Sequence, residues 1–207
     1  MAQEEKTLEE RMTPVERELF EKYKRKIGQI HIAPNDQEAI ANEVCIYFWG
    51  LGKEATWTWI KRWATVNEDF NALWFDEEYA RASRWGGIIA PPLYLISVHD
   101  GLAAGMELWC DIHLPGGMRP NRDKYPNLVG TPQGESEWEF FEPVRPGDTI
   151  DAEHKLVDLY WKEAKSGKKW GEWEYSRILF VVGETTYTNQ KGQLVGRNRS
   201  TGLVLFK

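Results

Sequence analysis

The chain has 207 residues and a formal net charge of -6, with 42% hydrophobic and 28% charged residues. This length and composition suit one soluble globular domain with an added helical segment. The acidic balance disfavours a nucleic-acid partner, because phosphate binding requires a basic surface. No apolar run approaches the roughly 20 residues of a membrane span, and the charged N-terminus does not resemble a secretory signal. We therefore expect a cytoplasmic protein without a membrane partner.

Two residue types narrow the class further. Cys45 and Cys110 are too few for a disulfide framework and lack the spacing of metal ligands, so we expect no metal site. Tryptophan is unusually frequent, with 11 in the chain. Trp161 and Trp173, within expected strands, are candidates for the core. The excess near residues 57–63 indicates either a partner subunit or a bulky, flat ligand.

The first half of the chain has the pattern of helices. Residues 13–16 (TPVE) form a capping box with proline at the first helical position, and apolar residues then recur every four positions to Ile27. Residues 35–38 offer a second capping box. Further helices are expected over about 55–67 and about 76–85, where the second ends at a pair of glycines.

The second half changes to strands after one apolar segment. Pro91 and Pro92 precede residues 93–108, which favour a buried helix because they are apolar on most sides and contain small residues. The expected strands, rich in β-branched and aromatic residues, cover residues 136–144, 149–163, 170–190 and 193–206. Helices followed by consecutive antiparallel strands predict an α+β fold, with a sheet around one buried helix.

Three segments carry a resemblance to a known family. They are NEDFNALWFDEEYARASRWGGIIAPP at 67–92, WEFFEPVRPGDTI at 138–150 and ETTYTNQKGQLV at 184–195. In this order they resemble the MaoC-like hydratases and dehydratases, most closely their N-terminal, FAS1-like dehydratase type of domain. The resemblance implies the hot-dog fold, an antiparallel sheet wrapped around a long central helix. It places an N-terminal helical extension at 1–54 and a hot-dog domain at 55–207.

The first of these segments is similar to the family's catalytic motif, Asp-x-Asn-Pro-(Leu/Ile)-His. In active members the Asp and His activate the water that adds across an α,β-unsaturated acyl thioester. Here Asp69, Asn71 and Leu73 match, Ala72 replaces the Pro and Trp74 replaces the His. An indole has one N–H donor and no usable base. Asp69 and Asn71 are therefore expected to be vestigial or supporting, as capping or turn residues.

The resemblance also implies a division of labour between subunits. The FAS1-like type often lacks the His, and a second hot-dog domain or subunit then carries the complete Asp/His dyad. The inactive one shapes the pocket that holds the acyl chain. The residues expected in this pocket, some of which an ordinary core explains as well, are Trp74, Phe75, Ile89, Ala90, Pro91 and Tyr94.

Coenzyme A carries phosphates, and arginine forks suit phosphates. A solvated loop is the alternative explanation of the basic residues expected to bind them, Arg119, Arg122 and Lys124. Of the histidines, His99 lies on the expected central helix, where it is a weak candidate to replace the missing base. His113 and His154 are expected at the surface.

Three functions fit these observations. The first is the pocket-forming, His-lacking subunit of a heteromeric enoyl-CoA hydratase or 3-hydroxyacyl-CoA dehydratase that acts on a bulky acyl thioester. Its partner would be a second hot-dog subunit with the Asp/His dyad. The second is a stand-alone acyl-CoA thioesterase that uses Asp69 to direct water. The third is a non-catalytic protein that binds acyl or aromatic ligands. No cofactor is expected besides the coenzyme A thioester itself.

Overall fold

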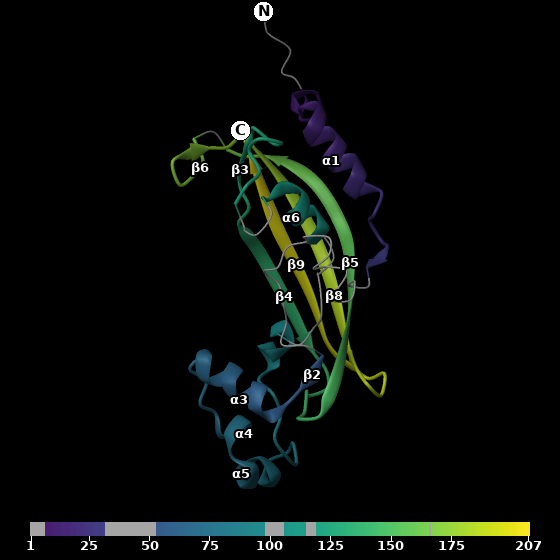
Figure 1. The fold of residues 1–207 in the computed structure, drawn as a ribbon, viewed down its shortest axis with the longest axis vertical. Helices are drawn as coiled ribbons and strands as arrows, with labels where there is room; N and C mark the ends of the chain where they lie inside the picture. The colour runs from purple at the N-terminus through teal and green to yellow at the C-terminus, as the bar shows by residue number, and fades with distance from the viewer. Residues whose placement is uncertain (1–6, 32–52, 98–105, 115–118, 166) are drawn as a thin grey trace, which may run out of the picture.

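The computed structural model describes residues 7–31, 53–97, 106–114, 119–165 and 167–207. Within them, a curved antiparallel sheet of seven strands is the central element (Figure 1). Its long neighbouring strands are β5 (Asp148–Glu163), β8 (Arg177–Asn189) and β9 (Leu194–Phe206). The fold is α+β, as the sequence predicts, and the strands expected over 149–163 and 193–206 correspond closely to β5 and β9, whereas the strand expected over 136–144 overlaps an observed strand only in residues 136–140.

Short strands complete the sheet on both sides. β1 (Ile30–His31) and β2 (Glu54–Ala55) pair with β5, whereas β3 (Leu128–Gly130) and β4 (Gln133–Phe140) pair with β9. Within the described residues, β4 pairs with β9 alone, so its other edge has no strand beside it. An unpaired edge presents free N–H and C=O groups, which favour pairing with another chain.

A bulge divides β5 into two halves. Leu156 pairs with Gly183 and Asp158 with Val182, so Val157 is an extra residue opposite the bond between the two partners. Before the bulge the buried side chains alternate from Ile150 to Leu156, and after it the alternation resumes at Leu159. Because successive side chains of a strand alternate between faces, one extra residue resets which positions point inward.

The N-terminal helix α1 (Pro14–Lys24) lies along one end of β5 and follows a short 3₁₀ turn, η1 (Glu9–Arg11) (Figure 1). The predicted capping box is confirmed: the Thr13 hydroxyl accepts from the Glu16 N–H, and the Glu16 carboxylate accepts from the Thr13 N–H. The second predicted capping box, at 35–38, lies outside the described residues.

Three helices gather at the opposite end of the sheet (Figure 1). α3 (Trp57–Val66) confirms the helix expected over 55–67. α5 (Glu77–Ala82) is shorter than expected, and a single-turn helix, α4 (Ala72–Phe75), precedes it. Asp76 ends α4 and also caps α5, since its carboxylate accepts from the N–H groups of the next turn.

The predicted central helix, 93–108, is only partly described. Its start is a 3₁₀ helix, η3 (Pro92–Ser97), and its end belongs to α6 (Met106–Ile112), which lies against the sheet in Figure 1. Two glycines of β9 permit this close approach. A Cβ at Gly196 would collide with Leu95 of η3, and one at Gly202 would collide with Trp109 of α6. No helix in the described part of the chain is long and apolar enough to cross a membrane.

The core consists of two clusters without a common residue. The α1-end cluster comprises Leu19, Phe20, Tyr23, Leu108, Ile112, Tyr125, Leu128, Leu156, Leu159, Leu179, Val181, Val204 and Phe206. The α3-end cluster comprises Ala55, Ile60, Ala64, Trp74, Ile89, Ala90, Tyr94, Leu95, Val144, Ile150, Tyr187 and Val195. The N-terminal helix thus contributes directly to the hydrophobic core of the sheet.

Three expectations from the sequence are wrong. Trp173 is not a core residue: the expected strand 170–190 begins as a separate hairpin of β6 (Lys169–Trp170) and β7 (Trp173–Glu174), and Trp173 remains 46% exposed. His113 and His154, expected at the surface, are both buried. Trp161, by contrast, is partly buried against the α1-end cluster, as predicted.

Candidate functional site

The residues of the family motif form the turn between α3 and α4. The Asp69 carboxylate accepts a hydrogen bond from the Asn71 N–H at 3.3 Å, and the Asn71 side chain accepts from the Leu73 N–H at 3.0 Å. Asn71 is the N-cap of α4, and both side chains are wholly or partly exposed. In this geometry the two polar residues shape the backbone that carries Trp74.

Trp74 is oriented inward by this turn and is 6% exposed. Its backbone carbonyl accepts a hydrogen bond from the indole of Trp57, at 3.1 Å, which fixes α4 against α3. Its own indole N–H is buried and has no hydrogen-bond partner in the described part of the chain. The position that the family motif gives to histidine therefore holds a buried donor that cannot exchange a proton near neutral pH.

The structure brings most of the predicted acyl-pocket residues together in the α3-end cluster. Its members include Trp74, Ile89, Ala90 and Tyr94. Phe75 is partly buried against the same cluster, and Pro91 is buried. Their convergence depends on contacts between segments far apart in the sequence. One of these is the hydrogen bond from the Ala90 N–H to the Val144 carbonyl, at 2.8 Å.

Tyr94 is the second polar group in this cluster. It is fully buried, its hydroxyl has no hydrogen-bond partner among the described residues, and burial raises its pKa to about 12. The hydroxyl is therefore neutral at ordinary pH. A buried polar group without a partner costs about 1–3 kcal/mol. With Trp74, the cluster thus holds two buried donors that have no partner among the described residues.

Further aromatic residues of this cluster were not predicted as site residues. Trp63 contacts Tyr94 edge to face, with ring centroids 6.4 Å apart. Trp138 stacks on Tyr187 at 5.8 Å, and burial raises the pKa of the Tyr187 phenol. The signal for Trp63 was its position on α3, three residues after Ile60 on the same helix face. Tyr187 lies in the family segment at 184–195. The alternation of apolar and polar residues in one sequence, however, does not show which side chain Tyr187 contacts.

No histidine completes a dyad with Asp69 within the described residues, where its carboxylate has the Asn71 N–H as its hydrogen-bond partner. His99 lies outside them. His113 bonds the Trp109 carbonyl and the Thr131 hydroxyl, and the Nδ1 of His154 bonds Thr185. Likewise, the described residues contain no group of three His, Cys, Asp or Glu side chains placed to hold a metal ion.

The predicted phosphate-binding residues do not meet the α3-end cluster. They lie in the loop between α6 and β3, beside the α1-end cluster (Figure 1). Arg122 donates to the carbonyls of Leu128 and Val129, at 3.0 and 2.8 Å. Arg119 is exposed, and Lys124 lies over the Tyr125 ring. Hydrogen bonding to Tyr125 and nearby carboxylates outweigh partial burial and raise the pKa of Lys124.

Comparison with known proteins identifies the class to which this fold and turn belong. The model of the FAS1-like dehydratase domain region matches residues 53–197. The chain therefore belongs to the FAS1-like dehydratase domain family. Its architecture is the α+β hot-dog fold of MaoC-like dehydratases, as the motif and the strand order predict.

Individual relatives are distant. The chain is 28% identical over 150 residues to a protein of Thermomonospora curvata named probable enoyl-CoA hydratase alpha subunit; the match covers 68% of this chain but 41% of that protein. The ChsH1-ChsH2 complex of Mycobacterium tuberculosis is 17% identical, with a TM-score of 0.52 and coverage of 90% and 89% of the two chains. A MaoC-like dehydratase of Rhodospirillum rubrum is 20% identical, with a TM-score of 0.44 and coverage of 74% and 86%.

Proposed function

We propose that this chain is the pocket-forming subunit of a heteromeric enoyl-CoA hydratase or 3-hydroxyacyl-CoA dehydratase. The observation that carries the proposal is Trp74. It occupies the histidine position of the motif, faces the core, and leaves Asp69 without a base beside it in the described residues. Addition of water to an enoyl thioester needs a base for water and an acid for the α-carbon. Within the described residues no such base and acid lie together at Asp69, so the proposal assigns both to a partner.

The names of the similar proteins support a heteromer. The relative from Thermomonospora curvata is named as an alpha subunit of an enoyl-CoA hydratase, and the structure from Mycobacterium tuberculosis is a complex of two different proteins. The chain covers less than half of the first relative, so that protein contains a further region. We infer that a hot-dog partner supplies the Asp/His dyad to this chain.

The free edge of β4 offers a place for that subunit. This strand is exposed along most of its eight residues and pairs with β9 alone in the described chain. Phe140 and Phe141, at its end, are exposed aromatic residues of the kind found at protein interfaces. Pairing at this edge would extend the sheet and would also place the partner's residues near Trp138 and the α3-end cluster.

The α3-end cluster supports a bulky acyl group with a polar atom. It contains several large aromatic side chains, while the indole N–H of Trp74 and the hydroxyl of Tyr94 lack partners among the described residues. A plain hydrocarbon chain would leave both donors unsatisfied, whereas a ring system with a carbonyl or hydroxyl oxygen would satisfy them. We therefore favour an oxygen-bearing, multi-ring acyl thioester over a short linear one.

The test is an enoyl-CoA hydration assay of the chain alone and of the chain co-expressed with a hot-dog protein that carries the Asp/His dyad. Activity that requires both chains supports the proposal. As a matched pair, Asp69→Asn in this chain is expected to leave most activity, whereas the same change in the partner's dyad abolishes it. Full activity of the chain alone would overturn the proposal.

The same experiment separates the alternatives. Release of free thiol from acyl-CoA by the isolated chain, lost in Asp69→Asn, would identify a thioesterase that uses this carboxylate. Tight binding of acyl-CoA without turnover, even in the presence of the partner, would identify a binding protein. Bulky and short substrates are compared in each arm, so that substrate choice is measured independently of the need for a partner.

A further inference from the structure

A pocket lies at the α1 end of the sheet, far from Trp74. Its volume is about 600 Å³, within the range of small-molecule sites. It is formed by the loop that leads into β3 and by the β6–β7 hairpin. The residues that line it are Pro120, Arg122, Val129, Gly130, Thr131, Trp170, Gly171, Glu172 and Trp173. Gly130 pairs with Leu205 at the end of β9, whereas Phe140 pairs with Gly196 near its start, so about 30 Å of strand separates the two ends.

Two tryptophan side chains that the rest of the fold covers only in part form the walls of the pocket. Trp170 and Trp173 are 49% and 46% exposed, although indole rings are costly to leave in water. Trp170 lies against the backbone of Gly130, where a Cβ would be 2.6 Å from the ring. The hairpin reverses at Gly171, which has a φ of 61°, in the left-handed region that favours glycine. The contact with Gly130 holds Trp170, while Lys207 Nζ lies 4.6 Å from the Trp173 ring centroid, and both rings keep about half of their surface exposed.

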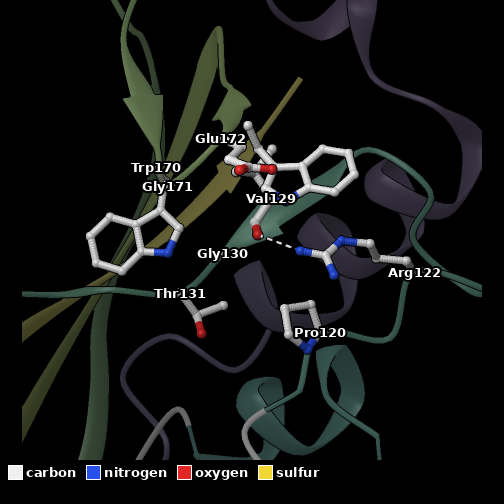
Figure 2. A pocket seen from close by; sticks show the side chains of 9 residues that line it. Pro120, Arg122, Val129, Gly130, Thr131, Trp170, Gly171 and Glu172 are labelled. Atoms are coloured by element: carbon white, nitrogen blue, oxygen red, sulfur yellow. Dashed lines mark hydrogen bonds between the residues drawn. The ribbon is translucent and has the colours of Figure 1, made fainter.

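Arg122 supplies a positioned cation. Figure 2 shows it across the pocket from Trp170, with its hydrogen bond to the Val129 carbonyl. Two of its N–H groups bind backbone carbonyls, and its guanidinium lies 5.2 Å from the Trp173 ring centroid. It has no ion-pair partner within the described residues, so its charge and its remaining N–H groups are available to a ligand.

Two acceptors complete the lining. Glu172, at the tip of the hairpin, has no ion-pair or hydrogen-bond partner in the part of the chain that the structure describes. Thr131 bonds His113, whose Nδ1 faces the Trp109 carbonyl and therefore carries the proton. The Thr131 hydroxyl then donates to His113 Nε2, which leaves its oxygen free to accept. Burial lowers the pKa of His113, so the imidazole is neutral at pH 7 and these two hydrogen bonds keep their directions.

We propose that this pocket binds a purine base, stacked on Trp170 and Trp173 with its acceptor edge toward Arg122 and its donor groups toward Glu172 and Thr131. Arginine pairs with the O6 and N7 acceptors of guanine, and carboxylates accept from amino groups. Every base has a flat π face that an indole can cover. The purine comes either from a free nucleotide or from the adenosine part of coenzyme A, and the proposal is independent of the catalytic role of the other end.

Isothermal titration of the full-length protein with GMP, AMP, coenzyme A and pyrophosphate tests this proposal. Both mononucleotides are expected to bind, and the double variant Trp170→Ser, Trp173→Ser is expected to bind them about 10-fold or more weakly. Phe141→Ser, which removes an equally exposed aromatic ring elsewhere, is expected to bind as the parent does. Circular dichroism establishes that each variant is folded.

The remaining measurements identify the source of the purine and provide an alternative variant in case the double variant does not fold. Tighter binding of coenzyme A than of either mononucleotide, weakened by the same double variant, assigns the site to the coenzyme, and the opposite order assigns it to a free nucleotide. If the double variant does not fold, Glu172→Ala serves instead, and a loss of about 5-fold or more for GMP is expected. Absence of purine binding, binding unchanged by these substitutions, or equal binding of pyrophosphate overturns the proposal.

Discussion

Glu16 and Arg177, 161 positions apart in the sequence, form a buried ion pair with an Oε2–Nη1 distance of 2.7 Å. Glu16 also closes the capping box of α1, and Asn127 donates to its other oxygen at 3.1 Å. Arg177 begins β8 and donates as well to the carbonyl of Lys207, at 2.9 Å. The pair therefore joins the N-terminal helix, the sheet and the C-terminus in one network, in which each buried charge is satisfied.

Glu16→Ala is expected to lower the free energy of unfolding by roughly 3–5 kcal/mol, because it leaves the buried Arg177 without its counter-charge. Urea denaturation followed by circular dichroism measures this change. Asp151→Ala is the matched control: it removes the exposed pair with Lys53, of similar length, and is expected to cost at most about 1 kcal/mol. Equal effects of the two substitutions would contradict the structural role of the buried pair.

Tyr94→Phe is expected not to lower the free energy of unfolding of the isolated chain and to raise it by at most roughly 1–3 kcal/mol. The reason is that it removes a buried hydroxyl that has no partner among the described residues. Tyr23→Phe provides the comparison. The Tyr23 hydroxyl donates to Asp111 at 2.7 Å, so its loss is expected to destabilise the chain. In the assembled enzyme, Tyr94→Phe should raise KM for an oxygen-bearing acyl group and leave KM for a plain chain unchanged. A similar change of KM for both substrates would argue against hydrogen bonding to the acyl group.

His113 gives the protein an acid-sensitive contribution to stability. Burial lowers its folded-state pKa below the usual 6.5, so at lower pH the unfolded chain binds a proton that the folded chain does not. The contribution is fully present above pH 6.5 and is lost as the pH falls through the lowered folded-state value. Urea denaturation at about pH 7 and about pH 5 should show a smaller loss of stability for His113→Gln than for the parent. An identical loss in both proteins would exclude His113 as its source.

Phe141→Asp is expected to disrupt assembly with the proposed partner subunit without unfolding the chain, since its side chain is exposed at the end of the edge strand β4. A charge in the centre of an interface is poorly tolerated. Size-exclusion chromatography of the co-expressed pair measures the loss of the complex. Trp173→Ser, on the distant hairpin, is the control. Intact assembly of Phe141→Asp would place the interface elsewhere.

Much of the fold was predictable because its local patterns agree with the tertiary structure. The capping box at Thr13, the helix from Trp57 and the strands β5 and β9 follow directly from side-chain periodicity and turn residues. The family resemblance at Asp69 and Asn71 located the turn that positions Trp74. In those segments the local sequence pattern agrees with the tertiary environment, so the sequence alone is sufficient to predict their structure.

The errors arose where the environment is set by distant segments. Trp173 continues the aromatic alternation that precedes β8, but the turn at Gly171 takes it into a hairpin beyond the sheet. His113 is buried because Thr131 and Trp109 enclose it. His154 has the same parity as Ile150 on β5, so its inward direction was predictable in principle. No feature of the sequence indicates that the Trp74 indole N–H and the Tyr94 hydroxyl have no partner among the described residues.

Strand β5 contributes to both core clusters. Ile150 and Ala152 contact the α3-end cluster, whereas Leu156 before the bulge and Leu159 and Trp161 after it contact the α1-end cluster. Because the described clusters have no residue in common, substitutions deep in one are expected to be only weakly coupled to the packing of the other. Under the proposed function, the residues around Trp74 can therefore vary with the acyl group while α1 keeps its contacts with the α1-end cluster.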